Sequence, residues 1–62
     1  MAAAGKLLTT REAAKYLSFK PQTLNNWRTS GEGPVYLKLG GSVRYLKSDL
    51  DQWIADRRKQ HT

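Results

Sequence analysis

The chain has 62 residues, which leaves room for one small domain near the size limit at which a chain without disulfides or metals folds alone. It contains no cysteine, which excludes disulfides and thiolate metal sites and suits a reducing compartment such as the bacterial cytoplasm. Lysine and arginine number 11 against 5 aspartates and glutamates, and the formal net charge of +6 favours polyanionic partners, nucleic acid before an anionic membrane.

The two ends of the chain are expected to lie outside the folded domain. Residues 1–6 are alanine-rich and are predicted to form a disordered leader, and 59–62 a frayed tail beside a domain at 7–58. The apolar pair Leu7-Leu8 is too short for a signal peptide or a membrane span, so neither export nor a membrane partner is expected.

A first helix is predicted to begin at Thr10. The spacing Thr9-x-x-Glu12 matches a capping box, in which the hydroxyl and the carboxylate each bind a backbone N–H. The apolar stripe that follows is centred on Ala13 and Ala14. Small residues at this place allow another helix to approach closely.

A second helix is predicted to begin at Pro21, whose fixed φ and missing N–H suit the first helical position, and to end at Gly31. Leu24 and Trp27 share its buried face, and Phe19 is expected to anchor the preceding turn in the core. The opposite face is uncharged and carries Gln22, Asn25, Asn26 and Thr29.

This amide-rich face predicts contact with bases. Glu, Lys, Arg and Ala form helices better than Asn, so adjacent asparagines cost helix propensity. Asn and Gln carry a donor and an acceptor, the pair of groups that binds adenine bidentately in the major groove. Two short helices, the second with an exposed polar face, match the plan of a helix-turn-helix.

Two alternating segments flank Gly40-Gly41 and predict a two-stranded hairpin with a primed turn. The side chains expected to face the core are Leu37, Leu39, Val43 and Tyr45. Those expected to face solvent or a phosphate backbone are Lys38, Ser42 and Arg44. A lone hairpin is marginal in water, so we expect it to lean on the helices.

A third helix is predicted with Ser48 as its N-cap and acidic residues in its first turn. Leu50, Trp53 and Ile54 form its apolar stripe. Because the tryptophans of both later helices lie on apolar stripes, core packing explains them better than base stacking. The cations at 57–59 suit the end of a helix dipole, with contact to DNA as the alternative.

This order of elements predicts an α+β fold, a small winged helix-turn-helix with two N-terminal helices, a two-stranded β-hairpin wing and a C-terminal helix. The chain also resembles the excisionase-type helix-turn-helix family, small winged helices related to the DNA-binding end of MerR-type regulators. The resemblance covers about 7–55. It is carried by LTTREAAKYL at 8–17, TL at 23–24, WR at 27–28, GGSVRY at 40–45, and SDL at 48–50 with Trp53.

The resemblance implies that the second helix enters the major groove and that the hairpin follows the backbone or the adjoining minor groove. In the second helix it implies DNA contacts by Gln22, Thr23, Asn25, Asn26 and Arg28. In the hairpin it implies Lys38, Ser42 and Arg44, and on the DNA backbone Thr10, Arg11 and Lys20. Arg28 lies near the buried face, so its stem is expected to pack while its guanidinium reaches a phosphate.

The sequence departs from the family at the start of the second helix. Lys20-Pro21 stands where a small polar cap is usual, and Lys20 cannot accept from the free N–H groups at that helix end. We expect this end to be looser until a phosphate occupies it.

The function implied is that of a phage excisionase, or recombination directionality factor. Such a protein binds double-stranded DNA beside an attachment sequence, bends it and directs an integrase toward excision. One small domain offers few base contacts, so several copies are expected to self-associate on adjacent sites.

Two alternatives remain open. One is a transcriptional regulator with the same fold, and the other is a protein-interaction module whose hairpin and basic tail bind an acidic partner. An enzyme, a cofactor and a metal site are not expected. The chain has a single histidine, His61, no phosphate-binding glycine loop, and no carboxylate pair outside helix-capping positions.

Overall fold

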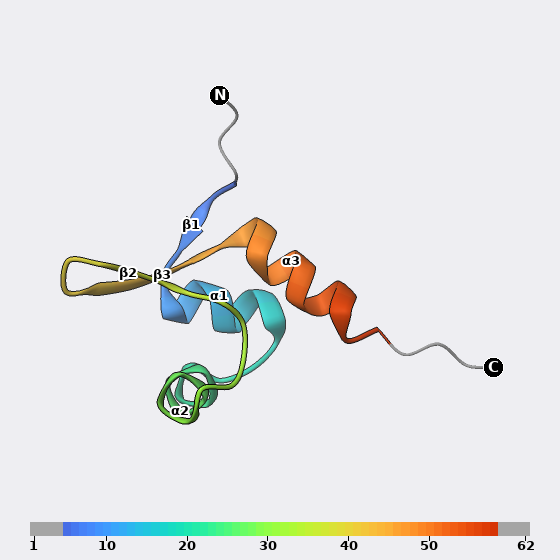
Figure 1. The fold of residues 1–62 in the computed structure, drawn as a ribbon, viewed down its shortest axis with the longest axis horizontal. Coiled ribbons are helices and arrows are strands. Elements are labelled where there is room, and N and C mark those ends of the chain that lie inside the picture. Colours follow the sequence, from blue (N-terminus) through green and yellow to red (C-terminus); the bar gives the residue numbers. More distant parts are fainter. Residues whose placement is uncertain (1–4, 59–62) are drawn as a thin grey trace.

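The computed structural model describes residues 5–58, so the expected tail at 59–62 and most of the expected leader, 1–4, lie outside the described residues. The elements in chain order are β1 (Leu7–Leu8), α1 (Thr10–Leu17), α2 (Pro21–Ser30), β2 (Leu37–Leu39), β3 (Ser42–Leu46) and α3 (Lys47–Asp56). They form a small α+β fold with an antiparallel sheet of order β1-β3-β2, and the β2–β3 hairpin connects α2 to α3 (Figure 1). The predicted fold class is confirmed.

Helix α1 is the centre of the fold. It contacts α2, α3, β1 and β3, and Figure 1 shows it between α2 on one side and α3 on the other. Ala13 and Ala14 have no exposed surface, so the small residues in its stripe do admit close neighbours. The core consists of Leu8, Ala13, Ala14, Leu24, Tyr45 and Leu50.

The predicted capping box starts α1. The Thr9 hydroxyl accepts from the Glu12 N–H at 3.1 Å, and the Glu12 carboxylate accepts from the Thr9 N–H at 2.9 Å. Two of the free N–H groups at the helix start are thereby bound. The helix ends at Ser18, which takes a left-handed φ of 64°.

A second polar cluster joins α1 to α3. The Tyr16 hydroxyl donates to the Asp51 carboxylate. Lys47 Nζ lies 3.0 Å from the same carboxylate and 5.1 Å from the centroid of the Tyr16 ring. The bond from Tyr16, followed by the bond from Lys47, lowers the pKa of Asp51, and the bond to Asp51 raises the pKa of Lys47. These groups are exposed, so the cluster orients the two helices without burying charge.

Acidification is expected to weaken the fold through Glu12 and Asp51. The backbone N–H of Thr9 holds the pKa of Glu12 below its usual value, as Tyr16 does for Asp51. The ionised forms therefore favour the folded state, a contribution complete above the unfolded pKa values of about 4 and lost as the pH falls through the lower folded values. Thermal unfolding between pH 6 and 3 should show a smaller acid-induced loss for Glu12→Gln than for the unchanged protein. Parallel profiles would contradict this assignment.

Strand β1 was not predicted. It pairs Leu7 with Leu46 and Leu8 with Tyr45, and the Lys47 N–H donates to the Lys6 carbonyl at 2.9 Å just beyond the strand. Two residues are too few to leave an alternating pattern, so the sequence does not signal this strand. Strand β1 adds a third strand to the β2–β3 hairpin and so gives it the support that an isolated pair lacks.

The predicted faces of the hairpin are wrong for β2. The register pairs Leu37 with Arg44, Lys38 with Val43 and Leu39 with Ser42. Directly paired residues point to the same face of a sheet, so Leu37 and Leu39 share the face of Arg44, while Lys38 lies on the opposite face with Val43. Leu39 is accordingly 48% exposed instead of buried. The two-residue turn at Gly40-Gly41 requires this register, because it pairs Leu39 directly with Ser42.

Three further side chains differ from prediction. Ser48 is not the N-cap of α3. Because β3 runs directly into the helix, α3 begins at Lys47 with Leu46 as its N-cap and no side-chain cap, and Ser48 lies inside the helix. Ile54 is 40% exposed, since only one side of α3 packs on the body. Phe19 is 43% exposed and meets the edge of Trp27, at 5.0 Å between ring centroids, without entering the core.

Candidate nucleic-acid interface

Helix α2 is fixed to the body by one fully buried residue, Leu24. It begins at Pro21 as predicted, with Lys20 as an N-cap that makes no side-chain cap bond, and it ends at Gly31 with a left-handed φ of 82°. The side chains that point outward are Gln22, Asn25, Asn26 and Thr29, all exposed, with Thr23 half-buried. The predicted amide face therefore lies on the surface.

Two of these amides are ordered by each other. Gln22 Nε2 donates to Asn26 Oδ1 at 3.0 Å, a pair one helical turn apart. The bond restricts both side chains and leaves the remaining N–H groups of each amide free to meet a partner outside.

The guanidinium of Arg28 is turned toward the protein. Nη1 donates to the Tyr45 hydroxyl at 2.7 Å and to the Thr10 hydroxyl at 3.3 Å, and Nη2 donates to Asn25 Oδ1. The group also lies over the ring of Tyr36, 5.7 Å from its centroid. Arg28 thus connects α2 to α1 and to the sheet, and three of its bonds are spent inside the molecule.

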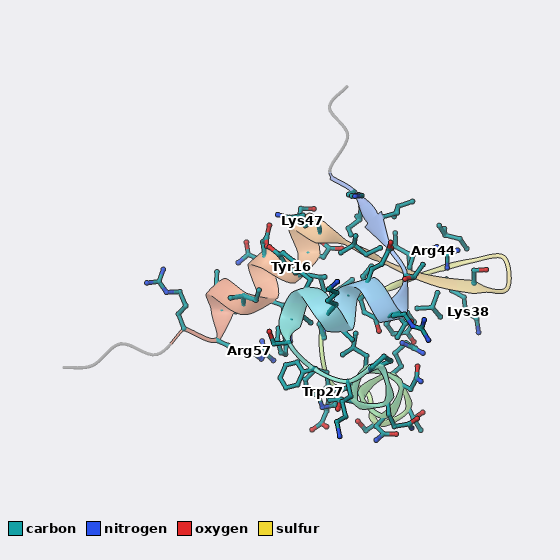
Figure 2. All side chains as sticks on the ribbon, turned by 180° about the vertical axis from the view of Figure 1, so that it is seen from behind. Tyr16, Trp27, Lys38, Arg44, Lys47 and Arg57 are labelled. Carbon is teal, nitrogen blue, oxygen red and sulfur yellow. The ribbon has the colours of Figure 1, made fainter. Side chains whose placement is uncertain are left out.

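The hairpin does not bring its three predicted residues onto one face. It projects from the helices (Figure 1), and its turn has a positive φ of 61° at Gly40. Lys38 and Ser42 are exposed but lie on opposite faces of the ribbon. Arg44 is half-buried and donates to the carbonyl of Val43 at 2.8 Å; Figure 2 shows it with Lys38 on the projecting hairpin.

The expected backbone-contact residues are spread over two elements. Arg11 on α1 and Lys20 before α2 are exposed, so both are available to phosphates. Thr10 is half-buried, and its hydroxyl accepts from Arg28.

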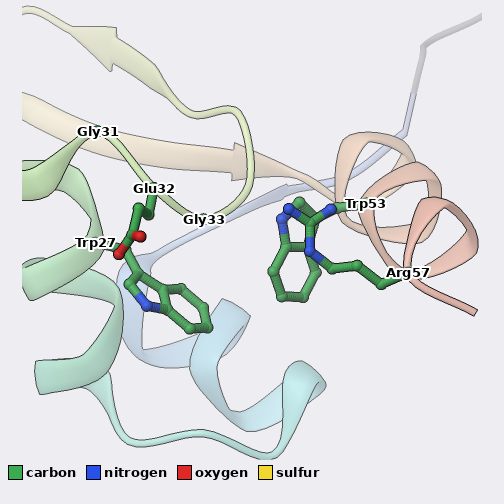
Figure 3. Close-up of a pocket in the computed structure, with 6 residues that line it drawn as sticks. All are labelled: Trp27, Gly31, Glu32, Gly33, Trp53 and Arg57. Atoms are coloured by element: carbon green, nitrogen blue, oxygen red, sulfur yellow. The ribbon is translucent and has the colours of Figure 1, made fainter.

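Trp27 and Trp53 pack against each other and do not point outward as surfaces on which bases could stack. Their ring centroids are 5.5 Å apart, and the guanidinium of Arg57 lies 4.3 Å from the Trp53 ring. Trp27 also packs on the core, as predicted. A cleft of about 420 Å³ beside the rings is lined by Trp27, Gly31, Glu32, Gly33, Trp53 and Arg57 (Figure 3).

Sequence reasoning missed the partners of Arg28. Tyr45 was expected only as a core residue, and Thr10 only as a backbone contact. The bonds from Arg28 reach across 17 and 18 positions of the chain. The sole local signal is that Arg28 follows the half-buried Trp27, and this does not identify the partners of the guanidinium.

The interface offers hydrogen-bonding groups and positive charge. Within residues 5–58, no three His, Cys, Asp or Glu side chains are grouped to hold a metal ion. The helices of that part of the chain are also too short or too polar to cross a membrane.

Comparison with known families agrees with this geometry. A family model described as a helix-turn-helix domain matches residues 7–58, a range that includes all three helices and the hairpin. No curated protein matches the chain. A helix-turn-helix suggests DNA binding, with the second helix of the motif in the major groove. The chain therefore belongs to the helix-turn-helix domain family.

Proposed function

We propose that this protein is a sequence-specific DNA-binding excisionase, a recombination directionality factor that acts by binding and not by catalysis. The observation that carries the proposal is the exposed, uncharged amide face of α2 on a chain with a net charge of +6. Positive charge supplies affinity for any duplex, whereas amides supply the donors and acceptors that distinguish bases. The resemblance to excisionases supports the finer assignment.

In this proposal α2 lies in the major groove of the duplex. Gln22, Thr23, Asn25 and Asn26 contact base edges. Lys38, Ser42 and Arg44 bind the backbone or the adjoining minor groove, with Lys38 and Arg44 on opposite walls of it because they lie on opposite faces of the ribbon. Thr10, Arg11 and Lys20 lie at the backbone, and Lys20 brings its charge to the uncapped start of α2, where a phosphate also binds free N–H groups.

Because the domain is small, we propose that several copies bind DNA cooperatively. A single domain offers few base contacts, so copies that bind adjacent repeats together reach useful specificity. A row of such copies bends the attachment-site DNA in the bacterial cytoplasm and positions an integrase for excision.

Footprinting on the attachment region of the element that encodes the protein tests this function. Protected repeats beside the recombination core, together with stimulated excision when integrase is added, are the expected result. Protection at a promoter alone would instead favour the alternative, a transcriptional regulator with the same fold. Absence of any duplex binding in low salt would favour the protein-interaction module.

Asn26→Ala and Arg44→Ala are expected to affect DNA binding in different ways. Loss of an amide at the base edge should cost about 1–3 kcal/mol on the specific site and little on random duplex. Loss of the hairpin guanidinium should weaken all sequences alike and reduce the salt slope by about 1. Gel shifts on specific and random duplexes at several salt concentrations measure both.

Gln52→Ala is the matched control for the amide variant. Gln52 is exposed on α3 and its amide donates to Asp56 at 2.8 Å, so its removal should leave both affinities unchanged. Equal losses on specific and random DNA for Asn26→Ala would show that this residue does not contact bases.

A further inference from the structure

Asn25 differs from the other amides of α2 because its partner can only donate. Arg28 carries N–H groups and no acceptor, so the Asn25 atom that faces Nη2 is the carbonyl oxygen Oδ1. The Asn25 amino group is therefore directed away from Arg28. The bond between Gln22 and Asn26 imposes no such direction, since each of those amides offers both a donor and an acceptor.

The core holds Arg28 in the position that imposes this direction. Its Nη1 donates at 2.7 Å to the hydroxyl of Tyr45, which is 1% exposed, and also to Thr10 at the start of α1. The ring centroids of Tyr36 and Tyr45 lie 5.7 and 6.0 Å from the guanidinium carbon of Arg28. The guanidinium therefore cannot follow a rotating Asn25 amide without breaking bonds to buried and half-buried groups.

The geometry points to Arg28 as a positioning residue that sets Asn25 as a hydrogen-bond donor toward DNA, so that the base contacted by Asn25 is guanine. This inference rests on the proposed function and specifies its ligand. Guanine offers two acceptors in the major groove, N7 and O6, to the two N–H groups of the Asn25 amide. Cytosine offers only its N4 donor, thymine offers the single acceptor O4, and adenine keeps only its N7 as a partner because the Asn25 oxygen is turned toward Arg28.

This inference reverses the simplest expectation for an asparagine in a recognition helix. A free asparagine favours adenine, with which it forms two bonds, one through its oxygen and one through its amino group. Asn26 has no arginine partner and keeps that preference. Asn25 and Asn26 are neighbours in sequence and should thus select different bases.

Selection from a randomised duplex library tests the inference. Asn25→Ala first identifies the base pair that depends on Asn25. At that pair the unchanged protein should bind guanine about tenfold more tightly than adenine, thymine or cytosine, measured by fluorescence anisotropy on duplexes that differ only there. Asn25→Asp keeps one oxygen on Arg28 and presents the other outward, so the preference should invert to cytosine over guanine, again by about tenfold.

Arg28→Met tests the positioning role itself. Without the guanidinium the Asn25 amide can turn, so guanine and adenine should approach equal affinity at this pair while preferences at the other pairs persist. A purely structural role for Arg28 would weaken discrimination at every pair alike. Asn26→Asp is the matched control and should leave the pair read by Asn25 unchanged. The Asn25→Asp arm retains Arg28 and decides the inference if Arg28→Met fails to fold.

Failure of the guanine preference and failure of the proposed function would give different results. Selection of a defined site with adenine, thymine or cytosine at the Asn25 pair, or no inversion by Asn25→Asp, would overturn the inference and leave sequence-specific binding intact. The same holds if Asn25→Ala changes no position. Enrichment of no sequence by the unchanged protein would overturn the proposed function, and the inference with it.

Discussion

Gly33→Ala is expected to destabilise the domain by about 2–5 kcal/mol, enough to unfold much of so small a protein. Gly33 has a φ of +83°, a conformation that costs an L residue about 1–2 kcal/mol. An added Cβ would also lie 2.7 Å from Cε3 and 2.9 Å from Cβ of Trp27 (Figure 3). Overpacking of this kind costs about 1–3 kcal/mol, because Trp27 is held between Phe19 and Trp53.

Gly31→Ala is the matched control for the contact with Trp27. Gly31 has nearly the same φ, +82°, but an added Cβ meets no atom of residues 5–58 within 4 Å. It should therefore lose only the conformational part, about 1–2 kcal/mol. Urea unfolding of the two variants isolates the cost of the contact as the difference between their free energies of unfolding. Equal losses would mean that Trp27 moves aside freely and that the packing beside the cleft is loose.

The elements that could be predicted from the sequence are those fixed by residues within about four positions of each other. The capping box of Thr9 and Glu12, the start of α2 at Pro21, and its end at Gly31 each depend on local backbone chemistry, and each is confirmed. The exposed face of α2 follows from its period alone. Local rules therefore suffice for the helix-turn-helix.

The errors arise where a second segment decides the outcome. The phase of β2 depends on the register across the turn, which pairs Leu39 with Ser42 and turns both leucines of β2 away from Val43. Strand β1 exists because β3 offers it an edge, and α3 starts early because β3 runs into it. None of these partners is visible in the pattern of one segment.

In the candidate site too, some features depend on nearby residues and others on a distant segment. The amides of α2 could be identified from their spacing, but the orientation of Asn25 depends on Arg28, which depends on Tyr45 of another element. Composition indicates which groups a surface offers. Only the tertiary contacts determine which atom of each group faces outward, and base selection is decided at that level.

Leu24→Ala is expected to cost about 2–5 kcal/mol of unfolding free energy and to abolish DNA binding at ordinary protein concentrations. Leu24 is fully buried and is the one core residue that α2 contributes, so its truncation leaves a cavity between α2 and α1. The amide face depends on that anchor for its position. Loss of binding should follow loss of the folded fraction in urea unfolding and in circular dichroism.

Leu39→Ala controls for the loss of a leucine side chain as such. Its side chain is 48% exposed on the hairpin, so the burial that is lost corresponds to about 1 kcal/mol or less. Specific duplex should progressively restore folding to Leu24→Ala as the DNA concentration rises, because DNA binds only the folded state and shifts the equilibrium by mass action. If Leu24→Ala matched Leu39→Ala in stability, α2 would be held by contacts other than its buried leucine. If added DNA did not restore folding, the lost binding of Leu24→Ala would not be due to loss of the folded fraction alone.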